Sequence, residues 1–203
     1  MIVFGQLNYT KTRWFHAIFM PVIIEFSRCI GTYSSAKFEL LKTKTEDHKL
    51  IRVAFVCWGN ICRSTLSESV FTYKVKELGL EDQFVIDSFA TSTEEIGNPP
   101  HRGTVNKLRE VGIPLVPHRA KQISFADYND FDYFIGMDEI NIKYLHRMLH
   151  GDPDGKVYKF LSFAGSDRDI ADPWYTGNFD VTYDDVLEGC GGFLMYLREN
   201  GEI

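Results

Sequence analysis

The run Cys-Trp-Gly-Asn-Ile-Cys-Arg begins at Cys57 and ends at Arg63, and Ser64 follows it. A thiolate is a strong nucleophile, and a planar guanidinium can bind two oxygens of a phosphate group at once. Gly59 permits a tight turn between Cys57 and Arg63. These residue types predict a loop that binds a phosphate group and attacks it through Cys57.

The other residues of this loop are expected to act largely through their backbone N–H groups. Successive N–H groups in a tight loop form a concave anion site, and the first turn of a helix adds partial positive charge. The same field would favour the thiolate form of Cys57 near neutral pH. Besides Cys57 and Arg63, the expected phosphate-binding loop consists of Trp58, Gly59, Asn60, Ile61, Cys62 and Ser64.

Such a loop requires a strand before it and a helix after it, and the flanking sequence predicts both. Residues 51–56 are a β-branched apolar run typical of a buried strand. Residues 64–78 carry apolar side chains at helical spacing and end before Gly79. Further strands are expected at 84–89, 133–136 and 157–163, and further helices at 104–111, 139–149 and 181–198. Strands that alternate with helices predict a parallel sheet covered on both faces.

The run Val-Cys-x-Gly-Asn-Ile-Cys-Arg-Ser at 56–64 resembles the signature of the low-molecular-weight protein tyrosine phosphatases. The likeness extends from about residue 51 to the C-terminus. It implies a flavodoxin-like α/β fold, a three-layer sandwich whose mostly parallel four-stranded sheet carries helices on both faces. It also implies transfer of a phosphoryl group from phosphotyrosine to Cys57 and then to water, without a metal or other cofactor.

The resemblance also directs attention to Asp172-Pro173-Trp174-Tyr175. In the family the aspartate protonates the departing phenol and then acts as base for water, and the two aromatic residues flank the substrate ring. The chemistry agrees, because a tyrosyl oxygen with a pKa near 10 leaves poorly without a proton. Pro173 favours an extended Asp172 and stiffens the loop. An Asp-Pro pair alone is usually turn chemistry, so the phosphate loop is what makes Asp172 a candidate.

Several residues, inside and outside these two motifs, also resemble the family's supporting network. Asn60 and Ser88 match residues that stabilise the strained loop, and Ser64 matches a hydroxyl that donates to the thiolate. His118 matches a member of the same network, and the alternative is a partly buried histidine with satisfied hydrogen bonds. The resemblance further suggests that Cys62 forms a reversible protective disulfide with the nucleophile, and the alternative is a packed small apolar side chain.

Three positions outside the signature need comment. Asp138 and Asn141 are expected to cap a helix rather than touch substrate. Glu94 stands at a pocket-wall position where several relatives carry an aromatic residue, so the substrate preference at the rim is open.

Other proteins that use a cysteine after a first strand fit less well. Arsenate reductases relay oxidation through two further cysteines, but no cysteine lies between Cys62 and Cys190. Phosphoarginine phosphatases carry threonine where Ile61 stands and lack the paired aromatics. A sugar-transport phosphocarrier needs neither Arg63 nor Asp172, and a binding module without turnover would not need all three catalytic candidates.

Composition limits the partners and the compartment. The formal net charge of −6 and the pI near 5.5 argue against a nucleic-acid partner. Four cysteines without regular spacing do not suggest a secreted disulfide framework, so a cytoplasmic location is expected. The spacing of Cys57 and Cys62 does not match a zinc site. The expected partner is a phosphotyrosine-containing protein or a small aryl phosphate, and the oligomeric state stays open.

Residues 1–50 differ from the expected phosphatase domain at 51–203. Residues 14–24 are almost wholly apolar, but they are too few to span a bilayer, and Glu25 and Arg28 follow directly. A secretory signal is disfavoured because no convincing cleavage site follows the apolar run. Two interpretations stay open: an extension of little order, and a helix that lies on a partner or membrane surface.

Overall fold

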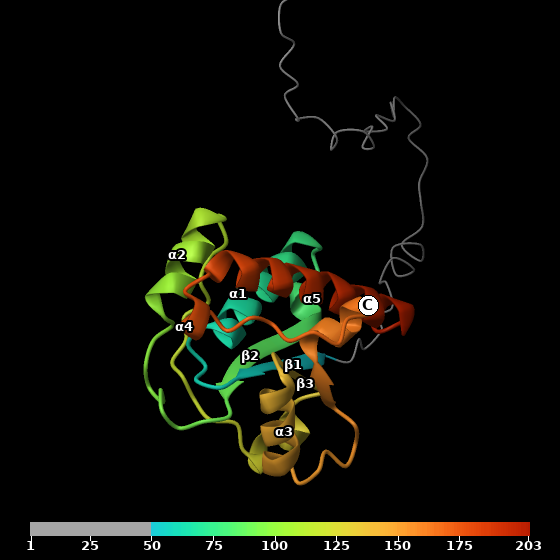
Figure 1. Cartoon of the computed structure of the whole chain (residues 1–203). Helices are drawn as coiled ribbons and strands as arrows, with labels where there is room; N and C mark the ends of the chain where they lie inside the picture. Colours follow the sequence, from blue (N-terminus) through green and yellow to red (C-terminus); the bar gives the residue numbers. More distant parts are fainter. Residues whose placement is uncertain (1–49) are drawn as a thin grey trace, which may run out of the picture. The chain divides into compact units, whose positions relative to one another are not determined.

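The computed structural model describes residues 50–203, so the expectations for residues 1–49 lie outside the described part. Four parallel strands form one sheet in the order β2-β1-β3-β4 (Figure 1). The strands are β1 (Ile51–Cys57), β2 (Phe84–Ala90), β3 (Tyr133–Gly136) and β4 (Val157–Lys159). The parallel sheet confirms the expected flavodoxin-like α/β fold.

Helices cover both faces of this sheet, with α1, α2 and α5 on one side and α3 on the other (Figure 1). The helices are α1 (Arg63–Glu77), α2 (Arg102–Glu110), α3 (Glu139–Met148), α4 (Pro173–Thr176) and α5 (Phe179–Glu199). The described residues also form the short 3-10 helices η3 (Glu81–Gln83), η4 (Phe125–Asp130) and η5 (Phe160–Ala164). Among the described residues, no helix is both long and apolar enough to cross a membrane.

Alternate residues of β1 serve the two cores, as the two-residue period of a strand requires. Val53 and Phe55 pack into the core beneath α1 and α5, and Ala54 and Val56 pack into the core beneath α3 and η4. Burial on both faces explains why β1 reads as a continuous apolar run. The strand is therefore a rigid support for the loop that begins at its carboxyl end, Cys57.

The carboxyl edge of the sheet brings distant segments together. Cys57 pairs with Ala90 at the end of β2, and Val56 pairs with Gly136 at the end of β3. In an open parallel sheet, ligands bind at this edge, where the chain leaves neighbouring strands in opposite directions. The segments after β1, β2 and β3 therefore surround one site.

The expected strand at 157–163 is wrong beyond Lys159, because the chain turns there into η5. Phe160 and Leu161 are apolar enough to read as strand, but both are buried under α5 in the 3-10 turn. Gly165, with φ 73°, ends this turn in the left-handed conformation. Tertiary packing thus overrides the local pattern, whereas α1, α2, α3 and α5 differ from their expected bounds by at most two residues.

The contact between α5 and η5 depends on glycines of α5. A Cβ at Gly192 would lie 2.6 Å from the backbone at Phe163 and Ala164, whereas a Cβ at Gly191 would meet nothing within 4 Å. Neighbouring positions of one helix thus differ in the space available.

We expect Gly192→Ala to lower the free energy of unfolding by about 1–3 kcal/mol through overpacking. Gly191→Ala should raise it by about 0.5–1 kcal/mol, because alanine favours the helix and no neighbour is displaced. Urea denaturation of both variants measures the difference. Equal effects at the two positions would contradict the close packing of α5 on η5.

Candidate active site

The nucleophile candidate lies at the junction of β1 and the loop that leads into α1. The Cys57 sulfur accepts a hydrogen bond from the backbone N–H of Asn60 at 3.3 Å and lies 3.1 Å from the Ser64 hydroxyl. Both groups approach the sulfur from the first turns after the strand. Donors at this position stabilise negative charge on sulfur.

The loop turns at Asn60, which has a left-handed backbone (φ 56°) and is fully buried. Its side-chain Nδ2 donates to the hydroxyls of Ser64 at 3.0 Å and Ser88 at 2.9 Å. Its Oδ1 accepts from the backbone N–H of Lys121 at 3.0 Å and lies 2.7 Å from Nε2 of His118. One amide therefore connects the loop to α1, β2 and the segment 118–121.

The backbone N–H of Lys121 fixes the direction of these bonds, because it can only donate. Oδ1 of Asn60 must face it, so Nδ2 faces the two hydroxyls. The Ser64 oxygen accepts from Nδ2, which leaves its proton for the Cys57 sulfur. The Ser88 oxygen also accepts from Nδ2, and its proton goes to a carboxylate oxygen of Glu68 at 2.6 Å.

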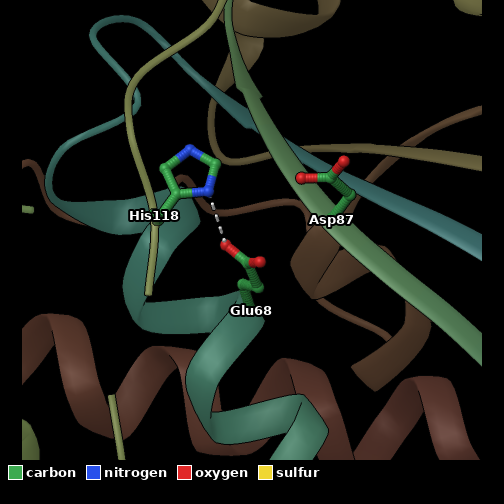
Figure 2. A group of neighbouring side chains, drawn as sticks. All are labelled: Glu68, Asp87 and His118. Carbon is green, nitrogen blue, oxygen red and sulfur yellow. Dashed lines mark ion pairs between the residues drawn. The ribbon is translucent and has the colours of Figure 1, made fainter. Parts of the chain in front are cut away.

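Figure 2 shows the far end of this network, where Glu68 of α1, Asp87 of β2 and His118 surround one space. Their nearest ligand atoms all lie within 4.8 Å of one another, and Nδ1 of His118 lies 3.4 Å from Glu68. Burial raises the pKa of Glu68 to about 7 and lowers the pKa of His118, so both neutral forms are favoured. Because Asn60 Oδ1 accepts from Nε2 of His118, Nδ1 is the ring nitrogen that faces Glu68.

This cluster has a donor set that suits a divalent cation, but protein groups occupy its donors. The ammonium of Lys121 lies 2.5 Å from Asp87, Glu68 accepts from Ser88, and His118 bonds to Asn60. We therefore describe the cluster as support for the loop. Sequence reasoning missed Glu68, although it follows Ser64 by one helical turn and so shares its face.

Arg63, the first residue of α1, is only 3% exposed and lies between two carboxylates. One guanidinium nitrogen lies 2.5 Å from Asp138, and the other lies 2.6 Å from Asp172. Burial alone would lower the pKa of Arg63, but the negative charges of Cys57, Asp172 and Asp138 outweigh it and raise that pKa. The guanidinium is thus charged and preoriented at the edge of the loop.

Asp138 has two partners where the sequence predicted one. Its Oδ1 caps α3 by accepting from the backbone N–H of Asn141 at 2.6 Å, as expected, and its Oδ2 binds Arg63. The second contact was missed because it joins residues 75 positions apart. Asp169, three residues before Asp172, pairs instead with Lys159 at 2.8 Å.

Asp172 precedes the four-residue helix α4 and caps it. Its Oδ1 accepts from the backbone N–H of Trp174 at 3.0 Å, and Pro173 occupies the first helical position. Trp174 and Tyr175 are 58% and 84% exposed. Both side chains line the same cavity as Asp172, as a wall that a planar ring can contact.

A cavity of about 490 Å³ joins the two motifs. Trp58, Ile140 and Tyr144 line it together with Glu94, whose carboxylate accepts from the Trp58 indole N–H at 3.0 Å. Trp58 and Tyr144 meet edge to face at 5.3 Å. The full lining is Cys57, Trp58, Gly59, Ile61, Cys62, Arg63, Glu94, Glu95, Asp138, Ile140, Asn141, Tyr144, Asp172, Trp174 and Tyr175.

Comparison with known proteins identifies this arrangement. The model of the family described as low molecular weight phosphotyrosine protein phosphatase matches residues 52–202. The chain belongs to this family. The chain is 38% identical over 156 residues to the low molecular weight protein-tyrosine-phosphatase YfkJ of Bacillus subtilis. The aligned region covers 76% of this chain and 100% of that protein.

Solved structures of relatives share the fold of this phosphatase. The crystal structure of YfkJ superimposes with a TM-score of 0.72 over 75% of this chain and 97% of that one. The low molecular weight protein tyrosine phosphatase of Streptococcus pyogenes is 41% identical, with a TM-score of 0.66 over 73% of this chain and 93% of that one. An arginine phosphatase of Drosophila is 29% identical, with a TM-score of 0.67 over 73% of this chain and 98% of that one.

The second cysteine of the phosphatase loop differs from the first in its surroundings. Cys62 is buried, and both cysteines line the cavity. Burial, followed by the negative charge of Cys57, raises the pKa of Cys62 to about 12. Cys62 is therefore a neutral thiol at physiological pH.

The structure brings the sequence-predicted residues together in one place. Those of the loop and the Asp-Pro motif line the cavity, except Asn60 and Ser64, which lie beneath the loop with Ser88 and His118. The lining residues that sequence reasoning missed include Ile140 and Tyr144 of α3. Their spacing of four residues in an expected helix was the available signal, because it puts both on one face.

Proposed function

We propose that this phosphatase hydrolyses phosphotyrosine through a phosphocysteine on Cys57. The observation that carries the proposal is the single cavity that contains the Cys57 sulfur, the Arg63 guanidinium and the Asp172 carboxylate. The substrate class is a phosphotyrosine-containing protein or a small aryl phosphate. The cavity suits an aryl group because Trp58, Trp174 and Tyr175 line it.

Substrate binding exchanges partners at Arg63. The phosphate dianion takes the guanidinium fork and the backbone N–H groups of the loop. Two phosphate oxygens then compete with the carboxylates of Asp138 and Asp172 for the same nitrogens. Asp172 is released from Arg63 and can carry a proton toward the bridging oxygen of the substrate.

The Cys57 thiolate attacks phosphorus, and the bond from phosphorus to the tyrosyl oxygen breaks. Asp172 gives its proton to the departing oxygen, so tyrosine leaves as the neutral phenol. In the second step Asp172 takes a proton from water, whose oxygen attacks phosphorus. The phosphorus–sulfur bond breaks, the thiolate is restored, and inorganic phosphate leaves. Ser64 supports both steps by donating to sulfur when it carries negative charge.

Two further parts of the proposal concern the residues that support the phosphate loop and the cellular compartment of the protein. Asn60, Ser88 and His118 keep the loop in its left-handed turn, which the buried hydrogen bonds support. The described cysteines, Cys57, Cys62 and Cys190, are free thiols, which suits a reducing compartment such as the cytoplasm.

A comparison of three phosphopeptides tests the function. In EDTA, the full chain should hydrolyse a phosphotyrosine peptide and act far more slowly on phosphoserine and phosphoarginine peptides. Cys57→Ser should still bind the phosphotyrosine peptide but lose turnover, because a serine hydroxyl does not ionise near neutral pH. A preference for phosphoarginine would assign the chain the activity named for the Drosophila relative, and loss of turnover in EDTA would contradict the proposed mechanism.

Asp172→Asn tests the general acid. Asparagine keeps the size and the cap of α4 but cannot release a proton. The rate loss should grow with the pKa of the leaving group, from 4-nitrophenol near 7 to tyrosine near 10, because the better leaving group departs partly unaided. General acid catalysis typically contributes about 10²- to 10⁴-fold. An equal loss for all aryl phosphates would show that Asp172 only shapes the loop.

We also propose that Cys62 protects the nucleophile by forming a disulfide with it. Peroxide converts the Cys57 thiolate to a sulfenic acid, which the Cys62 thiol attacks, and water leaves. Dithiothreitol should then restore the activity of the oxidised wild type but much less of that of Cys62→Ser, whose Cys57 has no resolving thiol. Equal recovery of the two proteins would contradict the pairing and leave Cys62 as a packed side chain.

A further inference from the structure

His101 is bonded to the phosphate loop from the start of α2. Its backbone N–H donates to the carbonyl oxygen of Ile61 at 2.8 Å. Its side-chain Nδ1 accepts from the backbone N–H of Gly103 at 3.1 Å and so caps the helix. Because Nδ1 accepts, the ring proton lies on Nε2. The imidazole is thus attached to a backbone that is itself bonded to the loop.

The His101 ring lies against two aromatic side chains on the other side of the site. It stacks on Phe179 at 5.6 Å with an interplanar angle of 7°, and it meets the Trp174 indole edge to face at 5.8 Å. A Cβ at Gly103 would lie 2.1 Å from the Phe179 ring, so glycine there admits Phe179 to this position. The cap and the stack together fix the plane of the imidazole.

Trp174 has little other support. Its side chain is 58% exposed, and among residues 50–203 the His101 ring is the aromatic group packed against it. The backbone N–H of Trp174 donates to the Asp172 carboxylate. A contact that fixes the indole of Trp174 therefore also restricts the Asp172 carboxylate, because the two residues share this hydrogen bond.

We propose that His101 is a positioning residue for the reaction: it joins the phosphate loop to the Asp172–Tyr175 segment and orients the Trp174 wall and, through it, Asp172. This inference rests on the proposed function. His101 is not among the residues that line the cavity. Its backbone bond to Ile61 does not depend on the side chain, so a substitution separates the ring contact from the phosphate loop.

Two substitutions separate the ring from the helix cap. His101→Asn keeps a side-chain acceptor for the N-terminus of α2 but removes the ring, whereas His101→Phe keeps a ring between Phe179 and Trp174 but removes the acceptor. The matched control is His150→Asn, because His150 stacks on Phe125 at 4.0 Å outside the site. The full 203-residue chain is used throughout.

His101→Asn should lower kcat/KM for a phosphotyrosine peptide by about 2- to 10-fold, the range expected for one lost aromatic pair. Inhibition by inorganic phosphate should stay within about twofold of the wild type, because the phosphate loop keeps its bonds. His101→Phe should retain kcat/KM within about twofold, although the lost cap lowers Tm by about 2–6 °C. His150→Asn should change neither kcat/KM nor phosphate inhibition.

Three results would overturn the inference. The first is a wild-type kcat/KM in His101→Asn. The second is an equal loss of kcat/KM in His101→Asn and His101→Phe. The third is a weakening of phosphate inhibition in His101→Asn as large as its loss of kcat/KM. The last two would show that His101 acts only through the fold of α2 and the loop. A wild type that turns over no aryl phosphate would instead overturn the proposed function, so the two failures are distinct.

Discussion

The side-chain amide of Asn60 has two donor and two acceptor positions, and all four are used in a place that solvent does not reach. The backbone of the same residue is left-handed, a conformation that costs most residues about 1–2 kcal/mol and that asparagine tolerates better than most. The network offsets this cost only in one orientation, because the Lys121 N–H can only donate. The shape of the loop and the direction of the Ser64 proton toward sulfur therefore depend on one buried amide.

Electrostatic balance places a second constraint on the site. Among the described residues that line the cavity, Arg63 is the one basic residue, and it forms ion pairs with Asp138 and Asp172. In the proposed function, a phosphate dianion replaces these carboxylates rather than occupying a free positive charge. Such an exchange adds little desolvation of the guanidinium itself, because this group is already buried before the phosphate binds. It also couples substrate binding to the release of the proposed acid.

Local pattern was enough to predict β1, α1 and the loop between them, because each is encoded in consecutive residues. The roles predicted for this loop and for Asp172 stay predictions. The second partner of Asp138 and the role of Glu68 were not accessible, since both depend on which distant segments meet at the carboxyl edge of the sheet. The strand predicted to continue beyond Lys159 was wrong for a related reason. An apolar run predicts burial, but the packing against α5 decides whether Phe160 lies in a strand or in a 3-10 turn.

The proposed mechanism gives the contacts of α4 different importance before and after substrate binds. Without ligand, the bond between Arg63 and Asp172 ties this short helix to the phosphate loop. In the proposed reaction, phosphate takes the place of Asp172 at Arg63 at the stage when the acid has to be aligned with the leaving oxygen. The edge contact between His101 and Trp174 and the bond from Thr182 to Ala171 at 2.9 Å then remain. If the proposed exchange of partners takes place, contacts outside the phosphate loop orient Asp172 in the substrate complex.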